Sequence, residues 1–247
     1  MESKKVHHNW FASWFDSPYY HILYSNRDED EASDFVDEIS EYLNLKDGSK
    51  ILDIACGKGR HSRHLNRLGY NVTGTDLSEE NIKYCREYEN DSLHFFKHDM
   101  RRLFRINYFD AAVNLFTSFG YFEHNRDDKM AIKAAAKGLK KNGKFVIDFM
   151  NVSKIALNLV PQNKSTIEGI EFTINRSAGN NFITKNIQFS DNGHDYNFDE
   201  KVKMLTLNDF KELFNHASLK IVDIFGNYQL DAFDEKTSDR LILVASK

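Results

Sequence analysis

The sequence is poor in the residues that mark several common classes of protein. Its 247 residues include only two cysteines, Cys56 and Cys85, and their spacing is not that of a zinc site. One follows a predicted strand and the other lies in a helical pattern, so we expect neither a disulfide nor a bound metal. Only two prolines are present, which indicates regular elements joined by short turns.

Long apolar runs and an excess of positive charge are also missing. No run is long enough to span a bilayer, and the opening MESKKVHHNW lacks the apolar segment of a signal peptide. We therefore expect a cytoplasmic protein that does not contact a membrane. The formal net charge is −4, whereas nonspecific nucleic-acid binding requires a basic excess, so nucleic acid is disfavoured as a partner.

Predicted strands and helices alternate through the middle of the chain. Strands are expected at 50–55, 71–75, 92–97, 108–116 and 144–149, with helices at 60–68, 78–89 and 126–139. This alternation predicts a parallel sheet covered by helices on both faces. A helix at 207–216 and strands at 219–226 and 240–245 complete the expected α/β fold. It is Rossmann-like and doubly wound, with a mostly parallel seven-stranded sheet.

Two further segments differ in character from this core. Residues 161–204 contain alternating stretches such as IEGIEFTINRS and NNFITKNIQFS, joined by Gly/Asn turns, which predict inserted antiparallel β-hairpins. Residues 1–45 combine the aromatic stretch WFASWFDSPYYHILY with a predicted helix. We therefore expect an aromatic lid and helix at 1–45, a core at 46–160 and 205–247, and a substrate cover at 161–204.

The stretch ILDIACGKGRHS places Asp53 inside an apolar strand and two glycines, Gly57 and Gly59, in the turn that follows. Glycines let a ligand approach the backbone, and the N-terminus of the next helix attracts anions. Asp76 ends the next strand nineteen residues after Gly57, a spacing at which an acid commonly binds ribose hydroxyls. Ser62 replaces the third glycine of the dinucleotide fingerprint, so a simple strand-to-helix turn is an equal alternative.

Four segments in order make the pattern more specific: DIACGKG, VTGTDLS, HDM and FDAAVNLF. Residues 51–149 therefore resemble the class I S-adenosylmethionine-dependent methyltransferases, in particular those that act on small molecules. The resemblance implies S-adenosylmethionine as the cofactor. It also implies a set of cofactor-binding residues at strand ends and in the turns that follow: Asp53, Ala55, Gly57, Gly59, Asp76, Leu77, Asp99, Met100 and Leu115.

The resemblance gives each of the three acids a role. Asp53 and the turn from 55 to 59 would face the methionine part of the cofactor, and Asp76 the ribose, with Leu77 on the adenine. Asp99 would accept from the adenine amino group beside Met100, while residues 114–116 would lie near the sulfonium. Each acid also has a structural alternative. In that alternative, Asp53 would only cap the glycine turn, Asp76 would only cap the next helix, and Asp99 would only pair with a neighbouring arginine.

Aromatic side chains predict the remainder of the site. Because aromatic faces attract cations, we expect Tyr20 in the N-terminal lid to contact the cofactor. The stretch LFTSFGYFEH follows a strand end, where ligands bind in open α/β sheets. Tyr121 and His124 are therefore the candidates for orienting the substrate or removing its proton. Packing for Tyr121 and a plain helix start for His124 are the alternatives.

The predicted activity is methyl transfer to an amine or hydroxyl of a small molecule by in-line displacement. Neither a D/N-P-P-Y/F motif nor a Pro-Cys pair is present, and the strand at 108–116 carries Asn114 where metal-dependent relatives would place an acid. Two alternatives remain open: a noncatalytic S-adenosylmethionine-binding protein and an NAD-dependent oxidoreductase. The sequence leaves the acceptor and the oligomeric state undetermined.

Overall fold

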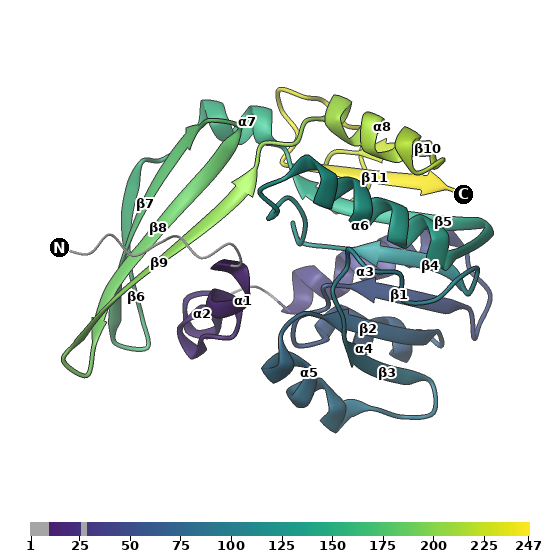
Figure 1. The fold of residues 1–247 in the computed structure, drawn as a ribbon, viewed down its shortest axis with the longest axis horizontal. Helices are drawn as coiled ribbons and strands as arrows, with labels where there is room; N and C mark the ends of the chain where they lie inside the picture. The colour runs from purple at the N-terminus through teal and green to yellow at the C-terminus, as the bar shows by residue number, and fades with distance from the viewer. Residues whose placement is uncertain (1–9, 26–28) are drawn as a thin grey trace.

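A seven-stranded sheet forms the centre of the protein (Figure 1). The computed structural model describes residues 10–25 and 29–247. The strand order is β10-β11-β5-β4-β1-β2-β3, with only the β5–β11 and β10–β11 pairs antiparallel. The strands are β1 (Lys50–Ile54), β2 (Asn71–Asp76), β3 (Leu93–Lys97), β4 (Phe109–Asn114), β5 (Leu139–Met150), β10 (Lys220–Phe225) and β11 (Arg240–Ser246). The predicted doubly wound α/β fold is confirmed.

Helices cover both faces of this sheet. Successive residues of a strand point to opposite sides, so each strand contributes side chains to two cores. Leu52 and Ala112 face a core shared with α6 and α8, whereas Ile51 and Ala111 face a core shared with α3, α4 and α5. The helices are α3 (Glu29–Leu43), α4 (Arg60–Arg67), α5 (Glu79–Cys85), α6 (Asn125–Gly138) and α8 (Leu207–His216). None of the described helices is both long and apolar enough to cross a membrane.

A second, four-stranded antiparallel sheet lies apart from the first in Figure 1. It follows the short helix α7 (Val152–Leu157) and consists of β6 (Gln162–Ile167), β7 (Ile170–Gly179), β8 (Phe182–Asp191) and β9 (His194–Lys203). The two N-terminal helices, α1 (Trp10–Phe15) and α2 (Pro18–Leu23), lie between the two sheets in Figure 1. Trp14 and Leu23 pack there with Phe172, Ile174 and other side chains of the second sheet.

The structure differs from the sequence predictions mainly at element ends. The helix predicted to reach residue 89 ends at Cys85 and continues as a 3-10 turn, η1 (Arg86–Tyr88). Helix α7 was not predicted, since six residues carry too little periodicity to be recognised. By contrast, α8 has the predicted bounds, and Thr206 forms a capping box with Asp209.

Candidate functional site

The carboxyl ends of β1 and β4 meet where the strand order reverses, the position at which open α/β sheets bind ligands. Asn114 ends β4, and its Nδ2 donates to the carbonyls of Ile54 at 2.9 Å and Ser118 at 3.2 Å. Its Oδ1 is buried and accepts no hydrogen bond from the described residues. This edge of the sheet therefore contains a buried acceptor that is available to a ligand.

The turn after β1 has two glycines for two different reasons. A Cβ on Gly59 would lie 2.8 Å from the Phe95 ring, so this glycine is required by packing. A Cβ on Gly57 would meet nothing within 4 Å, and the φ of Gly57 is +55°. This open backbone allows a ligand to approach closely. Ala55 also has a positive φ, 59°, although it carries a side chain.

Asp53 lies beneath this turn with 1% of its surface exposed. Its carboxylate accepts a hydrogen bond from Ser62 Oγ at 2.5 Å. Burial raises the pKa of Asp53 to about 7, and the nearby Asp76 carboxylate adds to the rise, while the Ser62 hydrogen bond opposes it. Asp53 therefore exchanges a proton near neutral pH and responds to any charge placed beside it.

Asp76 joins the glycine turn to the start of α5. Its Oδ2 accepts from the Gly57 N–H at 2.9 Å, and its Oδ1 accepts from the Ser78 N–H at 2.8 Å. Burial raises its pKa, and these two hydrogen bonds oppose the rise. The N-cap of α5 is Ser78, whose side chain accepts from the Asn81 N–H, so Asp76 is not the helix cap, and its role toward ribose stays a prediction.

Asp99 lies one strand further out, after β3, and is tied to Arg101. The guanidinium Nη2 lies 2.6 Å from Asp99 Oδ2, and the Arg101 N–H donates to Oδ1 at 2.9 Å. Burial alone would raise the pKa of Asp99, but the Arg101 hydrogen bonds and charge hold it below its usual value. The structure brings Asp53 and Asp76 together across the glycine turn, with Asp99 separately paired.

The apolar candidates divide between the two faces of the sheet. Leu77, Met100 and Tyr121 are half-buried against the core on the α6 side, together with Phe15 of the N-terminal helix α1. Leu115 is buried in the other core, on the α4 side. Three of the predicted residues therefore share one cluster with α1, while Leu115 supports the strand end from behind.

Helices α1 and α2, which we call the lid, bridge the second sheet and the glycine turn. Trp14 Nε1 donates to Glu200 Oε1 at 2.7 Å, and Tyr24 donates to the same oxygen at 2.6 Å. On the side that faces the core, Asp16 accepts a hydrogen bond from the Ser78 hydroxyl at the start of α5. Burial lowers the pKa of His21 to about 4, and the charge of Lys58 in the glycine turn adds to this effect. The lid thus lies directly beside the candidate site.

Tyr20, Tyr121 and His124 lie in different surroundings. The Tyr20 and Tyr121 rings both meet Phe15, with centroids 5.0 Å and 5.4 Å away. The Tyr121 hydroxyl donates to the Thr117 carbonyl. His124 is exposed at the N-cap of α6, where its side chain makes no capping hydrogen bond. The aromatic lid therefore reaches Tyr121, and the catalytic roles of Tyr121 and His124 stay predictions.

A second polar cluster at the same edge was missed from the sequence. Asp148 in β5 is fully buried and pairs with Arg240 of β11 at 2.7 Å. Its Oδ2 accepts from the Phe116 N–H at 2.7 Å, and Arg240 Nη2 donates to Thr117 Oγ1 at 2.9 Å. Phe116 and Thr117 have φ values of 56° and 59°. A carboxylate inside the apolar run FVIDF was the available signal, the same pattern that identified Asp53.

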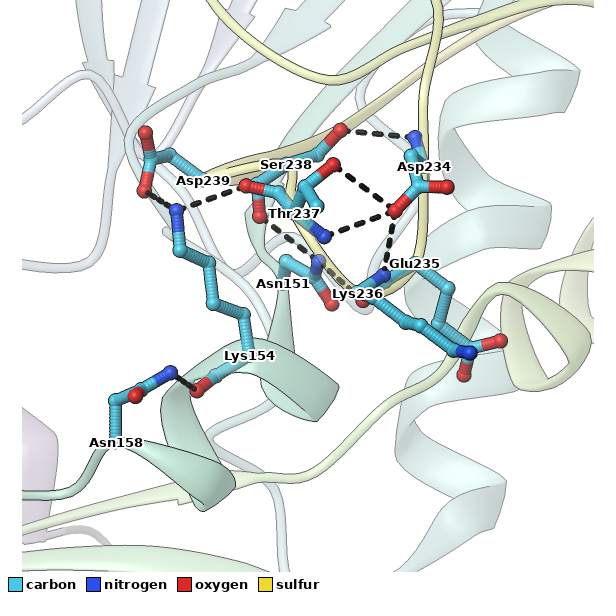
Figure 2. Close-up of polar contacts among 9 residues, drawn as sticks. All are labelled: Asn151, Lys154, Asn158, Asp234, Glu235, Lys236, Thr237, Ser238 and Asp239. Carbon is cyan, nitrogen blue, oxygen red and sulfur yellow. Dashed lines mark hydrogen bonds and ion pairs between the residues drawn. The ribbon is translucent and has the colours of Figure 1, made fainter.

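The loop between β10 and β11 completes this cluster and is fastened to α7 (Figure 2). Asn151 Nδ2 donates to the carbonyls of Glu235 at 2.9 Å and Ser238 at 2.8 Å, and Lys154 lies 2.5 Å from Asp239. The same loop supplies Tyr228, whose ring stacks on Phe116 with centroids 5.2 Å apart. The fastened loop therefore supports the strained backbone after β4.

Comparison with known proteins identifies the family. Residues 52–147 match the family model of a methyltransferase domain. The chain is 28% identical over 214 residues, 82% of this chain and 86% of the relative, to the putative methyltransferase YqeM of Bacillus subtilis. The chain therefore contains a class I S-adenosylmethionine-dependent methyltransferase domain. The dinucleotide-dependent oxidoreductase alternative is set aside.

Solved structures share the fold of this methyltransferase. A S-adenosylmethionine-dependent methyltransferase from Clostridium acetobutylicum superposes with a TM-score of 0.77 at 22% identity, covering 96% of this chain and 98% of that one. The S-adenosylmethionine-bound amino pentose methyltransferase CalS10 from Micromonospora echinaspora gives a TM-score of 0.70 at 18% identity, covering 93% and 97%. Both similarities extend beyond the matched domain, since they cover more than nine-tenths of this chain.

The methyltransferase site fits the cofactor in its donors and acceptors. The Gly57 backbone is open, Asn114 Oδ1 is an unused buried acceptor, and Asp53 is a carboxyl group that can ionise. The ammonium, the carboxylate and the ribose of S-adenosylmethionine all require hydrogen-bond donors or acceptors of this kind. Among the described residues, no group of three or more His, Cys, Asp or Glu side chains is placed to hold a metal ion.

Proposed function

We propose that this methyltransferase transfers the methyl group of S-adenosylmethionine to an amine of a small molecule. The observation that carries the proposal is the aromatic cluster formed where the lid meets the core. Phe11 and Phe15 contact Tyr121 with centroids 6.3 Å and 5.4 Å apart, and Trp14 packs on Phe198 of β9 at 4.4 Å. A lid packed this closely on the core suits a small acceptor, since a polymer would need an open groove.

The two candidate bases support an amine over a hydroxyl. A neutral amine attacks without prior loss of a proton, whereas a hydroxyl needs a nearby base. The Tyr121 hydroxyl is engaged with the Thr117 carbonyl, and His124 is exposed at the start of α6. Neither is arranged as a base beside the glycine turn. The likeness to an amino pentose methyltransferase points the same way.

The roles we assign to the protein are binding, orientation and exclusion of water. When bound, S-adenosylmethionine supplies an electrophilic methyl group for in-line displacement. Asp53 and the turn around Gly57 hold the methionine part, Asp76 the ribose, and Asp99 with Met100 the adenine. Tyr20 of the lid offers its face to positive charge. Good orientation of two reactants contributes up to about 7–11 kcal/mol to lowering a barrier.

Matched acceptors test the proposal. The purified protein is incubated with methyl-labelled S-adenosylmethionine and with pairs of small sugars and alcohols that differ only in an amino or hydroxyl group. We expect label in the amino member of at least one pair, together with formation of S-adenosylhomocysteine. Transfer confined to hydroxyl members contradicts the assignment of the acceptor atom. Transfer to RNA or protein alone contradicts the small-molecule class.

The Tyr121→Phe variant tests whether the lid contact acts on the acceptor. It keeps the ring that packs on Phe11 and Phe15 and removes only the hydroxyl. We expect unchanged S-adenosylmethionine affinity by calorimetry and a lower kcat for the accepted amine. Full activity of this variant would show that the Tyr121 side chain serves only in packing. Tyr42→Phe removes the same hydroxyl from an exposed tyrosine of α3 and is the matched control, expected to leave kcat unchanged.

A further inference from the structure

A basic cavity of about 320 Å³ lies along α4, on the side of the sheet covered by α3, α4 and α5. Its lining residues come from α3, α4, the 3-10 turn η1, the loop after η1 and the start of β3, and include Arg60, His61, Arg63, Arg67, Tyr88 and Leu93. Leu93 begins β3, so the cavity extends toward the amino ends of the strands. The cofactor edge lies at their carboxyl ends, so the cavity reaches well beyond it.

Positive charge dominates the lining. Arg60, Arg63 and Arg67 recur at helical spacing and so project from one side of α4. None of the described lining residues is acidic. Asp37, which is half-exposed, pairs with the lining residue His64, with its Oδ1 2.6 Å from His64 Nε2. This concentration of arginine stands out in a chain whose net charge is −4.

Two buried nitrogen atoms of this cavity lack a hydrogen-bond partner among the described residues. They are Arg63 Nε and His61 Nε2, and His61 is only 7% exposed. The Arg63 guanidinium stacks on the Tyr88 ring at 4.4 Å, which fixes the plane of its fork. Burial, with help from Arg60 and His64, lowers the pKa of His61 to about 3, so its ring is neutral, and it stacks on Phe116 with centroids 4.9 Å apart.

We propose that this cavity binds the phosphate or diphosphate group of a small molecule, at a site distinct from that of the cofactor. A guanidinium offers a planar set of donors that matches phosphate oxygens in pairs. A buried donor without a partner is costly, and a bound anion would satisfy it. The cavity has room for a diphosphate and for part of the group attached to it, beside the Tyr88 ring.

Pyrophosphate is the first probe, added to the full-length protein at constant ionic strength. We expect saturable binding by calorimetry and a higher Tm. In the Arg63→Gln/Arg67→Gln variant the affinity should fall at least tenfold, and in Arg67→Gln alone, which alters an exposed side chain, severalfold. Lys129→Gln/Lys133→Gln removes the same charge from exposed positions on α6 and should bind as the unaltered protein does.

Three results would overturn the proposal. The first is equal loss in the α6 control, which would show that only net charge matters. The second is equal loss of S-adenosylmethionine affinity in the arginine variants with their fold intact by circular dichroism, which would place the anion in the cofactor site. The third is single-stranded RNA binding that tightens with length and exceeds pyrophosphate, which would indicate a nucleic-acid surface. A nucleoside diphosphate that binds more tightly than pyrophosphate supports the proposal and assigns a role to Tyr88.

Discussion

At the level of single residues, the turn after β1 is held in a strained conformation. Ala55 has a φ of 59°, in the left-handed region that costs a residue with a Cβ about 1–2 kcal/mol. The Cys56 N–H donates to the Thr75 carbonyl at 3.0 Å, and the Cys56 carbonyl accepts from the Gly59 N–H at 2.9 Å. Strand pairing therefore holds a conformation that Ala55 by itself disfavours.

Replacing Ala55 with glycine should relieve this strain. We expect Ala55→Gly to raise the free energy of unfolding by up to about 1 kcal/mol, because glycine adopts the left-handed region without steric cost, although it loses more entropy on folding. Urea denaturation measures the change. Ala134→Gly, in the helix α6, is the control and should destabilise by about 1 kcal/mol. Equal destabilisation by both variants would contradict a strained Ala55.

Asp53 should make the stability of the protein depend on pH. Its pKa is about 7 in the folded protein against an ordinary value of 3.8, so the folded state holds a proton that the unfolded chain releases. This contribution is complete below pH 3.8 and is lost as the pH rises through 7. The slope approaches about 1.4 kcal/mol per pH unit for one full proton. Asp53→Asn should remove it in urea denaturation between about pH 5 and 8.

The same carboxyl group links cofactor binding to proton release. If the ammonium of the methionine part lies beside Asp53, binding favours the ionised carboxylate. S-adenosylmethionine should then release protons at about pH 6.5, just below the pKa of Asp53, measured by calorimetry in buffers of different ionisation enthalpy. Asp34→Asn, an exposed change, should keep the release, and Asp53→Asn should lose it. No release by the unaltered protein would place the ammonium elsewhere.

At the level of elements, the lid belongs structurally to the second sheet. Trp14 and Tyr24 share Glu200 of β9 as acceptor, Lys185 of β8 lies 3.1 Å from its other oxygen, and Tyr19 donates to Asp191 at 2.8 Å. Toward the core, the lid relies on aromatic contacts and on the Asp16–Ser78 hydrogen bond. The lid is therefore joined to the second sheet by polar contacts as well as by packing.

Glu200→Ala should detach the lid from this sheet. Trp14 is buried and its Nε1 would lose its acceptor, a loss of about 1–3 kcal/mol. We expect faster hydrogen exchange at residues 14–24 with unchanged exchange in β1 and β4. Glu171→Ala breaks an exposed pair with Lys164 on the same sheet and should change hydrogen exchange neither at residues 14–24 nor in β1 and β4. Faster exchange throughout the core would show that Glu200 stabilises the whole fold instead.

At the level of the whole molecule, one buried ion pair fastens the second sheet to the core. Lys203 at the end of β9 pairs with Asp128 of α6 and lies 2.9 Å from Asn125 Oδ1. Both charged side chains are at most 6% exposed. The Lys203 N–H also donates to the Gly120 carbonyl at 2.8 Å, in the loop after β4. The strand that ends the insertion thus reaches directly into the candidate site.

Lys203→Met should therefore destabilise the protein by about 3–5 kcal/mol, because it leaves a buried carboxylate unpaired. Burial already raises the pKa of Asp128, and Lys203 opposes the rise. Without Lys203, Asp128 takes up a proton more readily, so the loss should be smaller at about pH 5.5 than at about pH 8. Urea denaturation at both pH values measures it. Lys203→Met/Asp128→Leu should recover much of the stability, and an equal loss at both pH values would contradict this account.

Local sequence patterns predicted the parts of the candidate site whose geometry depends on neighbours in sequence. The order of strands and helices, the glycine turn and Asp53 followed from local patterns. Asp148 and Arg240 were missed although they lie at the same edge, because ninety-two residues separate them and pairing between distant strands leaves no local signal. Asp99 and Asp76 were placed correctly at strand ends, and pairing with a neighbouring arginine was already an alternative for Asp99, but the Gly57 N–H as the partner of Asp76 required the structure.

The sequence by itself determined the α/β fold and the turn after β1, because periodicity and turn residues are local properties of a chain, and the resemblance of its ordered motifs to a known family indicated the cofactor class. Only the tertiary structure decided how the lid attaches, which acids meet, and where the arginines of α4 gather. These depend on contacts between segments far apart in sequence, such as Trp14 with Glu200 and Asp128 with Lys203. Such contacts form only when packing of the core fixes the distance between their elements.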